Sequence, residues 1–247
     1  MDIGVSLVES YLRLCGYLTL TEFGVQGRAP EGGFESITDV DVMGLRLPGD
    51  VYAAEAEGLD APAHLLLIED PVLRLQPGMV DVLIGEVKQG EAQFNPGLRR
   101  REVLHSLLRR VEWLYAEPVE AVVGDLIAHY LRMSPARGGG EIRTRLVAFG
   151  RSAHCDLHTI SHAHIIEAMV GFLSGLGEAF HPAQFHEAAP AMLNLLVKQG
   201  FRLGRATEAG SAPGGGGEGP GPAGVDGSGG HSVPLQTGAG DDPVGHP

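Results

Sequence analysis

The chain has 247 residues and a formal net charge of −13 at pH 7, with 43% hydrophobic and 6% aromatic residues. This length allows one domain, or one domain with a small appendage, and supplies ample apolar material for a core. Two cysteines exclude a disulfide-rich scaffold, and no apolar run approaches the length of a membrane span. The first residues include acids where a secretory signal peptide has bases, so we expect a soluble, cytoplasmic protein without membrane contact.

Hydrophobic periodicity predicts a helix followed by three strands in the first part of the chain. Apolar side chains recur at helical spacing over residues 5–15, and Gly16 ends that pattern. Segments 17–25, 37–47 and 79–88 are rich in β-branched or alternating apolar residues, which is typical of strands. Residues 48–77 between the last two strands are acidic and loop-like, and we interpret them as an insertion.

The second part of the chain is predicted to be mostly helical. Helical stripes cover 98–115, 118–132, 161–176 and 187–199. A strand at 142–149 alternates arginines with apolar residues, and a short strand is expected near 156–160. From 206 to 247 the chain consists mainly of Gly, Pro, Ser and acidic residues, without aromatic residues, lysine or arginine. Such a segment buries too little apolar surface to offset its ordering entropy, so we expect a disordered tail.

Charge is unevenly distributed along the chain. Residues 1–87 carry a net charge of −11, whereas residues 88–151 carry +4 and include Arg99, Arg100, Arg101, Arg109 and Arg110. A local basic patch on an acidic protein is compatible with phosphate contact, and a solvated helix face explains it equally well.

Glu86-Val87-Lys88 follows directly on the apolar run of residues 80–85. Residues i and i+2 of a strand share a face, so the carboxylate and the ammonium are expected to project side by side. The lysine is itself informative, because Lys88 and Lys198 are the only lysines among 18 basic residues. An arginine fork does not readily replace a compact ammonium at a buried position.

Asp39 and Asp41 lie on one face of the second predicted strand. Together with Glu86-x-Lys88 they give an ordered Asp…Glu-x-Lys pattern, which resembles the PD-(D/E)xK, or restriction-endonuclease-like, nuclease family. That family places the Asp at the end of one strand and Glu-x-Lys on the neighbouring strand. Many members add a Glu on the first helix, and Glu9 occupies that place in this chain.

The resemblance implies an α/β fold with a restriction-endonuclease-like core of helix, three-stranded mixed sheet, helix and strand. It covers residues 1–150, with 48–77 as an insertion, and leaves 151–205 as a helical C-terminal extension and 206–247 as the tail. The spacing of 45 residues between Asp41 and Glu86 departs from a simple hairpin and requires that insertion.

By the same resemblance, the protein is expected to hydrolyse phosphodiester bonds, most naturally in DNA. Mg²⁺ or Mn²⁺ would be held by Asp41, Glu86 and the carbonyl of Val87, with Asp39 as the competing ligand. Lys88 would position or deprotonate the attacking water, and Glu9 would support a second ion or orient water. Asp41 is preferred over Asp39 because the apolar Val42-Met43 follows it directly.

Three alternatives stay open at the level of sequence. The domain could keep this fold without catalysis and bind nucleic acid or a protein through the 98–115 helix or the tail, and a homodimer is compatible with either reading. Gly32-Gly33 before Asp39 also suggests a nucleotidyltransferase, which has no use for Glu86-x-Lys88. Histidines 154, 158, 162 and 164 with Cys155 suggest zinc, but their spacing matches no closed tetrahedral template.

Overall fold

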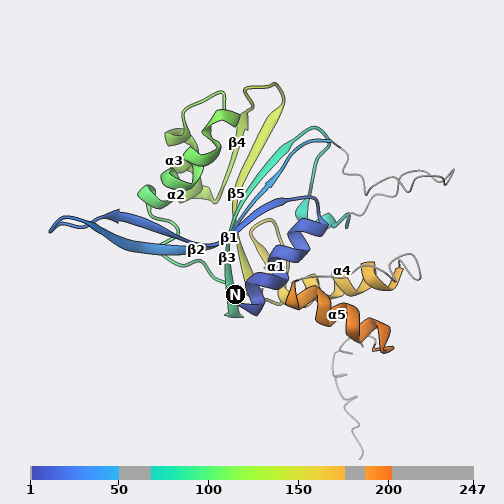
Figure 1. The fold of residues 1–247 in the computed structure, drawn as a ribbon. Coiled ribbons are helices and arrows are strands. Elements are labelled where there is room, and N and C mark those ends of the chain that lie inside the picture. Colours follow the sequence, from blue (N-terminus) through green and yellow to red (C-terminus); the bar gives the residue numbers. More distant parts are fainter. Residues whose placement is uncertain (1, 50–67, 176–186, 202–247) are drawn as a thin grey trace, which may run out of the picture. The chain divides into compact units, whose positions relative to one another are not determined.

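The computed structural model describes residues 2–49, 68–175 and 187–201. The chain divides into a unit of residues 1–204 and a unit of residues 205–247, and all described residues belong to the first. The tail expected at 206–247 and most of the insertion expected at 48–77 lie outside the described residues. The described part is a mixed α/β structure with a curled sheet and five α-helices (Figure 1). None of the helices in these ranges is long and apolar enough to cross a membrane.

Four of the five helices begin and end within three residues of the segments that periodicity predicts. The helices are α1 (Ile3–Leu14), α2 (Arg101–Leu108), α3 (Val119–His129), α4 (His162–Gly175) and α5 (Ala188–Lys198). The start of α1 is fixed locally, because the Asp2 side chain accepts hydrogen bonds from the first backbone N–H groups of the helix.

Six strands form one mixed sheet. They are β1 (Leu18–Arg28), β2 (Phe34–Arg46), β3 (Val80–Glu91), β4 (Leu131–Pro135), β5 (Glu141–Arg151) and β6 (Thr159–Ser161). The order is β1-β2-β3-β5-β4, with β6 beside β5. The first three strands pair antiparallel, β5 runs parallel to β3, β4 is antiparallel to β5, and β6 is parallel to β5. The parallel step from β3 to β5 is made possible by the helical crossover through α2 and α3.

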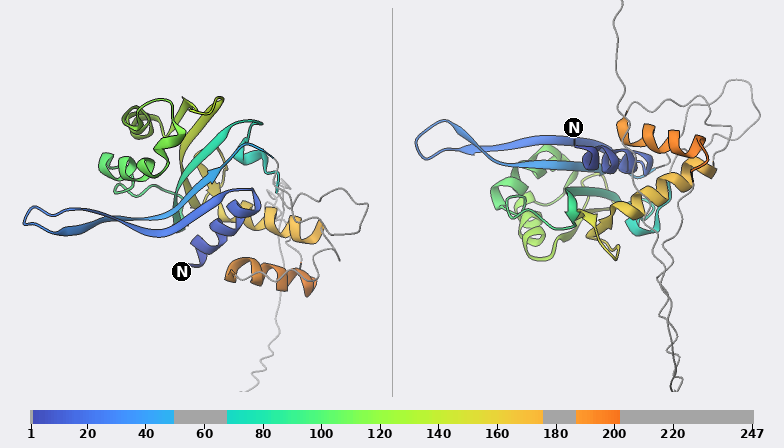
Figure 2. Two further views of the ribbon diagram at one scale, coloured as in Figure 1. Left: turned by 45° about the horizontal axis from the view of Figure 1, so that its top comes forward. Right: turned by 90° about the horizontal axis from the view of Figure 1, so that it is seen from below.

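β1 and β2 continue far beyond the sheet as a two-stranded ribbon (Figure 2). They stay paired out to Arg28 and Phe34, whereas β2 pairs with β3 only over residues 42–46. The turn at the tip contains Gly32 and Gly33, with φ of 93° and 86°, values that only glycine adopts easily. Gly32-Gly33 therefore belongs to a hairpin turn in this structure.

Two hydrophobic cores lie on opposite faces of the sheet. On one face α2 and α3 pack over residues such as Val82, Ile84 and Leu146. On the other face α1 and α4 pack over residues such as Leu83 and Val147. The near-continuous apolar runs of β3 and β5 follow from this arrangement, because a central strand covered on both faces alternates between two buried environments.

The structure corrects the expected elements between 98 and 132. The segment expected as one helix over 98–115 is α2 followed by a 3₁₀ helix, Arg109–Leu114. The helix expected to reach residue 132 ends at His129, because Tyr130 adopts a left-handed conformation with φ 61°. The chain then pairs with β5 as β4, a strand missing from the expectation. The free edge of β5, a tertiary feature, determines the structure of this segment.

The arginines of β5 are buried structural residues. Arg143 donates to Asp81 Oδ1 at 2.7 Å, and Arg145 donates to Asp81 Oδ2 at 2.9 Å. The Tyr17 hydroxyl donates to the same Oδ2. Burial alone would raise the pKa of Asp81, but Arg143, Arg145 and Tyr17 outweigh it and hold that pKa below its ordinary value. The carboxylate is thus fully compensated in the core on the α1 side.

We expect Asp81→Asn to lower the free energy of unfolding by roughly 3 kcal/mol or more, because it leaves two buried guanidiniums without a counterion. Since the folded pKa of Asp81 is lowered, the stability contributed by its charge is present above the unfolded pKa and is lost as pH falls through the folded pKa. Urea unfolding followed by circular dichroism at several pH values measures this difference, which should shrink towards acid.

Glu102→Gln is the matched control, because Glu102 pairs with Arg100 at the surface and both side chains are about half exposed. Its effect should be much smaller, because substitutions at exposed surface positions usually change stability little. Equal effects of the two substitutions would show that the Asp81 network does not stabilise the fold in this way.

Candidate active site at the ends of strands β2 and β3

The ladder between β2 and β3 ends at the pair Val42 and Gly85. Glycine is required there, because a Cβ on Gly85 would lie 2.5 Å from Val42 Cγ1 and 2.8 Å from Phe149 Cε2. Just beyond this pair, the Asp41 carboxylate accepts a hydrogen bond of 2.7 Å from the backbone N–H of Val87. A side-chain acceptor thus replaces a ladder carbonyl, and regular pairing stops without leaving that donor unpaired.

Glu86 and Lys88 form an ion pair on β3 through Oε1 and Nζ. The Glu86 side chain is 3% exposed, whereas the Lys88 side chain is 35% exposed. The second oxygen, Glu86 Oε2, is buried and has no hydrogen-bond partner among the described residues. An unpaired buried acceptor costs free energy, so the described protein groups satisfy this carboxylate only in part.

Both carboxylates of the pair Asp41 and Glu86 have a raised pKa. For Glu86 the main cause is burial, which the Lys88 ammonium opposes and the charge of Asp41 reinforces. For Asp41 burial again dominates, the Val87 N–H and Lys88 oppose it, and the charges of Asp2 and Asp39 add to it. The two groups therefore interact with each other and with Lys88, and this part of the sheet favours added positive charge.

The alternation of β3 explains which way these side chains point. Val82 and Ile84 belong to the core under α2 and α3, and Glu86 and Lys88 continue that face of the strand. Val87 belongs to the core under α1 and α4. The ion pair and the Val87 side chain are therefore on opposite faces of the sheet, and the Val87 backbone links them to Asp41.

Asp39 is placed differently from Asp41. It is exposed, whereas Asp41 is half-buried. Asp39 pairs with Gly24 across the β1–β2 ladder, and a Cβ on Gly24 would lie 3.3 Å from Asp39 Oδ1. Asp39 therefore lies beside β1, and it influences the candidate site only through its charge, which raises the pKa of Asp41.

Glu9 contacts α1 and β1. It is buried, and its Oε1 accepts from Arg13 Nη2 at 2.7 Å and from the Thr19 hydroxyl at 3.2 Å. The Thr21 hydroxyl is at 3.5 Å from the same oxygen. The described contacts thus bring together Asp41, Glu86, Val87 and Lys88, and they do not bring Glu9 into that group.

The sequence interpretation places none of Asp2, Gln89 and His162 beside the site, although it names His162 in the zinc alternative. Asp2 Oδ2 accepts a hydrogen bond of 2.8 Å from Gln89 Nε2, while its Oδ1 caps α1. His162 also lies at the start of α1, since a Cβ on Gly4 would be 3.5 Å from its Cε1, and burial lowers its pKa. An aspartate directly before an apolar helical stripe marks an N-cap and could have identified Asp2. Nothing in the sequence places His162 there.

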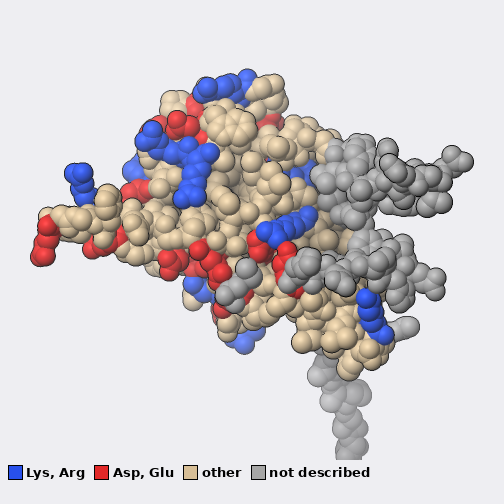
Figure 3. All heavy atoms as spheres, in the orientation of Figure 1, with Lys and Arg blue, Asp and Glu red and all other residues tan. Residues whose placement is uncertain are grey.

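Most arginines of the basic stretch already have acidic partners. Figure 3 shows Lys and Arg interspersed with Asp and Glu over α2 and α3. The pairs are Arg100–Glu102, Arg109–Glu112, Arg132–Glu117 and Arg151–Glu91, together with Arg143 and Arg145 on buried Asp81. Arg110 instead lies 4.7 Å over the ring of Phe23 on β1. The positive net charge of 88–151 is therefore not a continuous basic surface.

The histidine-rich segment is held by hydrogen bonds. His158 Nδ1 lies 3.0 Å from the Leu146 carbonyl, and His164 Nε2 lies 2.6 Å from Asp70 Oδ2. The Cys155 thiol contacts Ser161. Within the described ranges, no group of three or more His, Cys, Asp or Glu residues is arranged to hold a metal ion.

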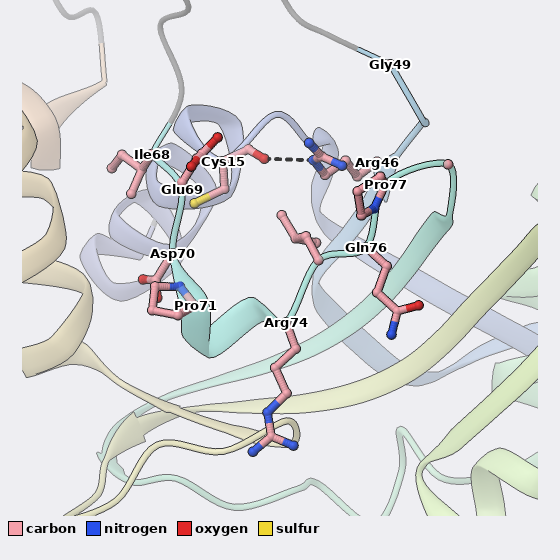
Figure 4. Close-up of a pocket in the computed structure, with 12 residues that line it drawn as sticks. Cys15, Arg46, Gly49, Ile68, Glu69, Asp70, Pro71, Arg74, Gln76 and Pro77 are labelled. Atoms are coloured by element: carbon pink, nitrogen blue, oxygen red, sulfur yellow. Dashed lines mark hydrogen bonds between the residues drawn. The ribbon is translucent and has the colours of Figure 1, made fainter.

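A hollow of about 610 Å³ lies away from this site (Figure 4). Cys15, Arg46, Asp70 and Arg74 are among its lining residues. Arg46 pairs with Asp81 near the start of β3, whereas Glu86 and Lys88 lie towards its end. The hollow and the candidate site are therefore at opposite ends of the β2–β3 ladder.

Comparison with known proteins adds no relative. No family model matches this chain, and searches of curated proteins and of solved structures give no match either. The function is therefore inferred from the geometry of the site.

Glu86→Gln should stabilise the protein in the absence of metal, by about 1 kcal/mol at neutral pH, the scale seen when a strained functional group is replaced. The folded pKa of Glu86 is raised, so its charge opposes folding above that pKa, and the cost disappears as pH falls through it. Chelator-treated protein, unfolded in urea at pH 5 and pH 8, measures the difference.

Glu102→Gln again serves as the control, because the pKa of this exposed carboxyl is lowered. That substitution should bring no gain. A loss of stability in Glu86→Gln at pH 8 would mean that the Lys88 pair outweighs the cost of burial.

Proposed function

We propose that this protein is a metal-dependent phosphodiesterase that cleaves DNA, with Asp41, Glu86 and Lys88 as its working residues. The observation that carries the proposal is the buried, unpartnered Oε2 of Glu86, beside Asp41 and Lys88, where the β2–β3 ladder ends. A protein that needed Glu86 and Lys88 only as a structural ion pair would gain nothing from leaving one oxygen buried and unsatisfied.

The order of elements supports the restriction-endonuclease-like part of this proposal. A helix, α1, precedes three antiparallel strands, and helices then lead to β5, which pairs parallel with β3. The sequence resemblance implies this succession for residues 1–150. The long ribbon, β4 and β6 are additions to that core in the proposal.

The donor set suits a hard divalent cation. Mg²⁺ prefers oxygen ligands and keeps several waters, so two carboxylates and a backbone carbonyl are enough protein ligands. Asp41 and Glu86 would hold the ion, with the Val87 carbonyl as a third ligand, and Glu86 Oε2 has a free acceptor position for it. When bound, such an ion would neutralise charge on the phosphate and lower the pKa of a bound water, so that hydroxide is available to attack near neutral pH.

Lys88 would contribute a second positive charge beside the reacting phosphate. Its ammonium pairs with Glu86 Oε1 while the Lys88 side chain as a whole is 35% exposed, so it could contact both a substrate phosphate and a water molecule. There it would orient the attacking water and stabilise the negative charge that develops on the phosphate oxygens. Arginine would fit less well, because its guanidinium is larger and presents its donors in a rigid plane, whereas the ammonium is compact and its three donors rotate.

Metal binding is testable without any substrate. We expect Mn²⁺ to raise the melting temperature of the wild type in a concentration-dependent way, because an ion that binds only the folded state stabilises it. Glu86→Gln and Asp41→Asn should abolish this shift, whereas Glu102→Gln should retain it. A shift of the same size in all four proteins would place the ion elsewhere.

The decisive assay is cleavage of supercoiled plasmid, linear duplex and single-stranded DNA with Mg²⁺ or Mn²⁺. Lys88→Ala should reduce the rate by about 100-fold or more, the usual scale for a positioned proton-transfer group, with circular dichroism unchanged. Lys88→Arg should recover little of this loss. Glu9→Gln, run in parallel, shows whether a residue held by Arg13 and Thr19 contributes to the reaction.

Each result of the cleavage assay has a definite meaning. Cutting that survives Lys88→Ala would assign the activity to a contaminant or to another site. Salt-dependent DNA binding without cutting by any metal would replace the proposal with a non-catalytic binding module. If the protein neither cuts nor binds DNA, then DNA is not its ligand.

A further inference from the structure

The part of β3 that carries Lys88 lies between two interruptions in the sheet. The ladder with β2 ends at Gly85, and the regular ladder with β5 ends at Val87 and resumes only at Glu91. Lys88 and Gln89 therefore lie in an irregular stretch of β3 without register partners on β2 or β5, although the backbone of Gly90 still lies close to Gly150 on β5. The sheet holds such a stretch less regularly, so side-chain contacts help to fix its position.

Gln89 provides such a contact. Alternation directs it away from the face that carries Lys88, towards α1. Its Nε2 donates a hydrogen bond of 2.8 Å to Asp2 Oδ2. Figure 1 shows the start of α1 beside the end of β3, in agreement with this bond.

Asp2 is itself held from two other directions. Its Oδ1 accepts hydrogen bonds from the Gly4 and Val5 N–H groups at 2.7 and 3.4 Å. Its own backbone N–H donates to Glu22 Oε1 on β1 at 2.9 Å. Both carboxylate oxygens and the amide of one residue thus connect α1, β1 and β3, which makes Asp2 a fixed anchor for the end of β3.

We propose that the hydrogen bond between Asp2 and Gln89 is a positioning contact that holds the Lys88 segment for the reaction. The proposal rests on the proposed function for its catalytic consequence, but the contact itself can be tested without substrate. Asp2 and Gln89 act through the backbone of β3 and need not touch the substrate.

Exchanging the donor and the acceptor between residues 2 and 89 distinguishes loss of this hydrogen bond from a general effect of charge. Asp2→Asn keeps the helix cap, because Asn and Asp are equally good at that position. It places an amide donor opposite Gln89, whose own amide rotates by 180° and accepts through Oε1, so the hydrogen bond is kept with its direction reversed. Gln89→Glu places two carboxylates together. The double variant Asp2→Asn/Gln89→Glu restores one donor and one acceptor with the same shape and the same net charge as the wild type.

The small number of lysines gives a direct structural readout. Protein labelled with ¹⁵N-lysine shows only two lysine backbone amides, those of Lys88 and Lys198. We expect Gln89→Glu to speed hydrogen exchange at the Lys88 amide about fivefold, the effect of losing one net hydrogen bond, and Asp2→Asn, which keeps the bond, to stay near the wild type. The double variant should return to within about twofold of the wild type. The Lys198 amide, on α5, is the internal reference and should not change.

DNA cleavage is measured on the same four proteins. Gln89→Glu should lose about fivefold in kcat with KM little changed, and the double variant should recover, since a displaced catalytic group loses rate rather than affinity. Unchanged exchange at Lys88 in Gln89→Glu would overturn the positioning role. Loss in Gln89→Glu without recovery in the double variant would also overturn it, because charge near Asp41 would then be responsible.

Failure of the proposed function gives a different pattern. If the wild type cuts no DNA and the Lys88 amide still responds and recovers as expected, the contact holds this segment and the nuclease assignment is wrong. If the wild type cuts DNA while exchange and kcat stay constant in all variants, the nuclease assignment stands and the positioning contact is wrong.

Discussion

The hydrogen bond from the Val87 N–H to the Asp41 carboxylate is the contact on which the candidate site depends. It allows regular pairing between β2 and β3 to stop after Val42 and Gly85 without leaving that buried backbone donor unpaired. Glu86 and Lys88 follow directly on this last pair along β3. In the proposed function, the end of the ladder is where the cation and the phosphate bind.

The two buried carboxylates on β3 lie in opposite electrostatic environments. Asp81 receives Arg143, Arg145 and the Tyr17 hydroxyl, and its pKa is lowered. Glu86 pairs with Lys88, and a hydrogen bond from the Asn95 backbone also lowers its pKa, yet its Oε2 has no partner among the described residues and burial keeps its pKa raised. The first arrangement stabilises the fold, whereas the second stores an unsatisfied charge. Unsatisfied charge concentrated at one end of a rigid strand is the pattern that functional sites share.

The surface limits how a long polyanion could be bound. The ribbon and the start of α1 contribute acidic residues near the site, and three arginines around α2 and α3, namely Arg100, Arg109 and Arg132, are paired with neighbouring carboxylates. Affinity for DNA that came from general electrostatic attraction would therefore be weakened and strongly screened by salt. In the proposed function the cation holds the substrate phosphate, and Lys88 acts on the attacking water and on the transition state. The position of the Lys88 segment then affects the rate of the reaction more than the binding of substrate.

Local sequence patterns are enough to locate most of the secondary structure and to place the key side chains on one face of a strand. Periods of 3.6 and 2 residues located four helices and the main strands, and alternation placed Glu86 and Lys88 on one face of β3. The tertiary structure decided the rest. The bond from Val87 to Asp41 spans 46 residues and that from Arg145 to Asp81 spans 64, so both depend on strand order and register. The same holds for Glu9, whose contacts are set by how α1 lies on β1, and for residues 131–135, which become β4 because β5 offers a free edge. Local pattern fixes which residues can face a site, and only the packing of distant segments fixes which of them meet there.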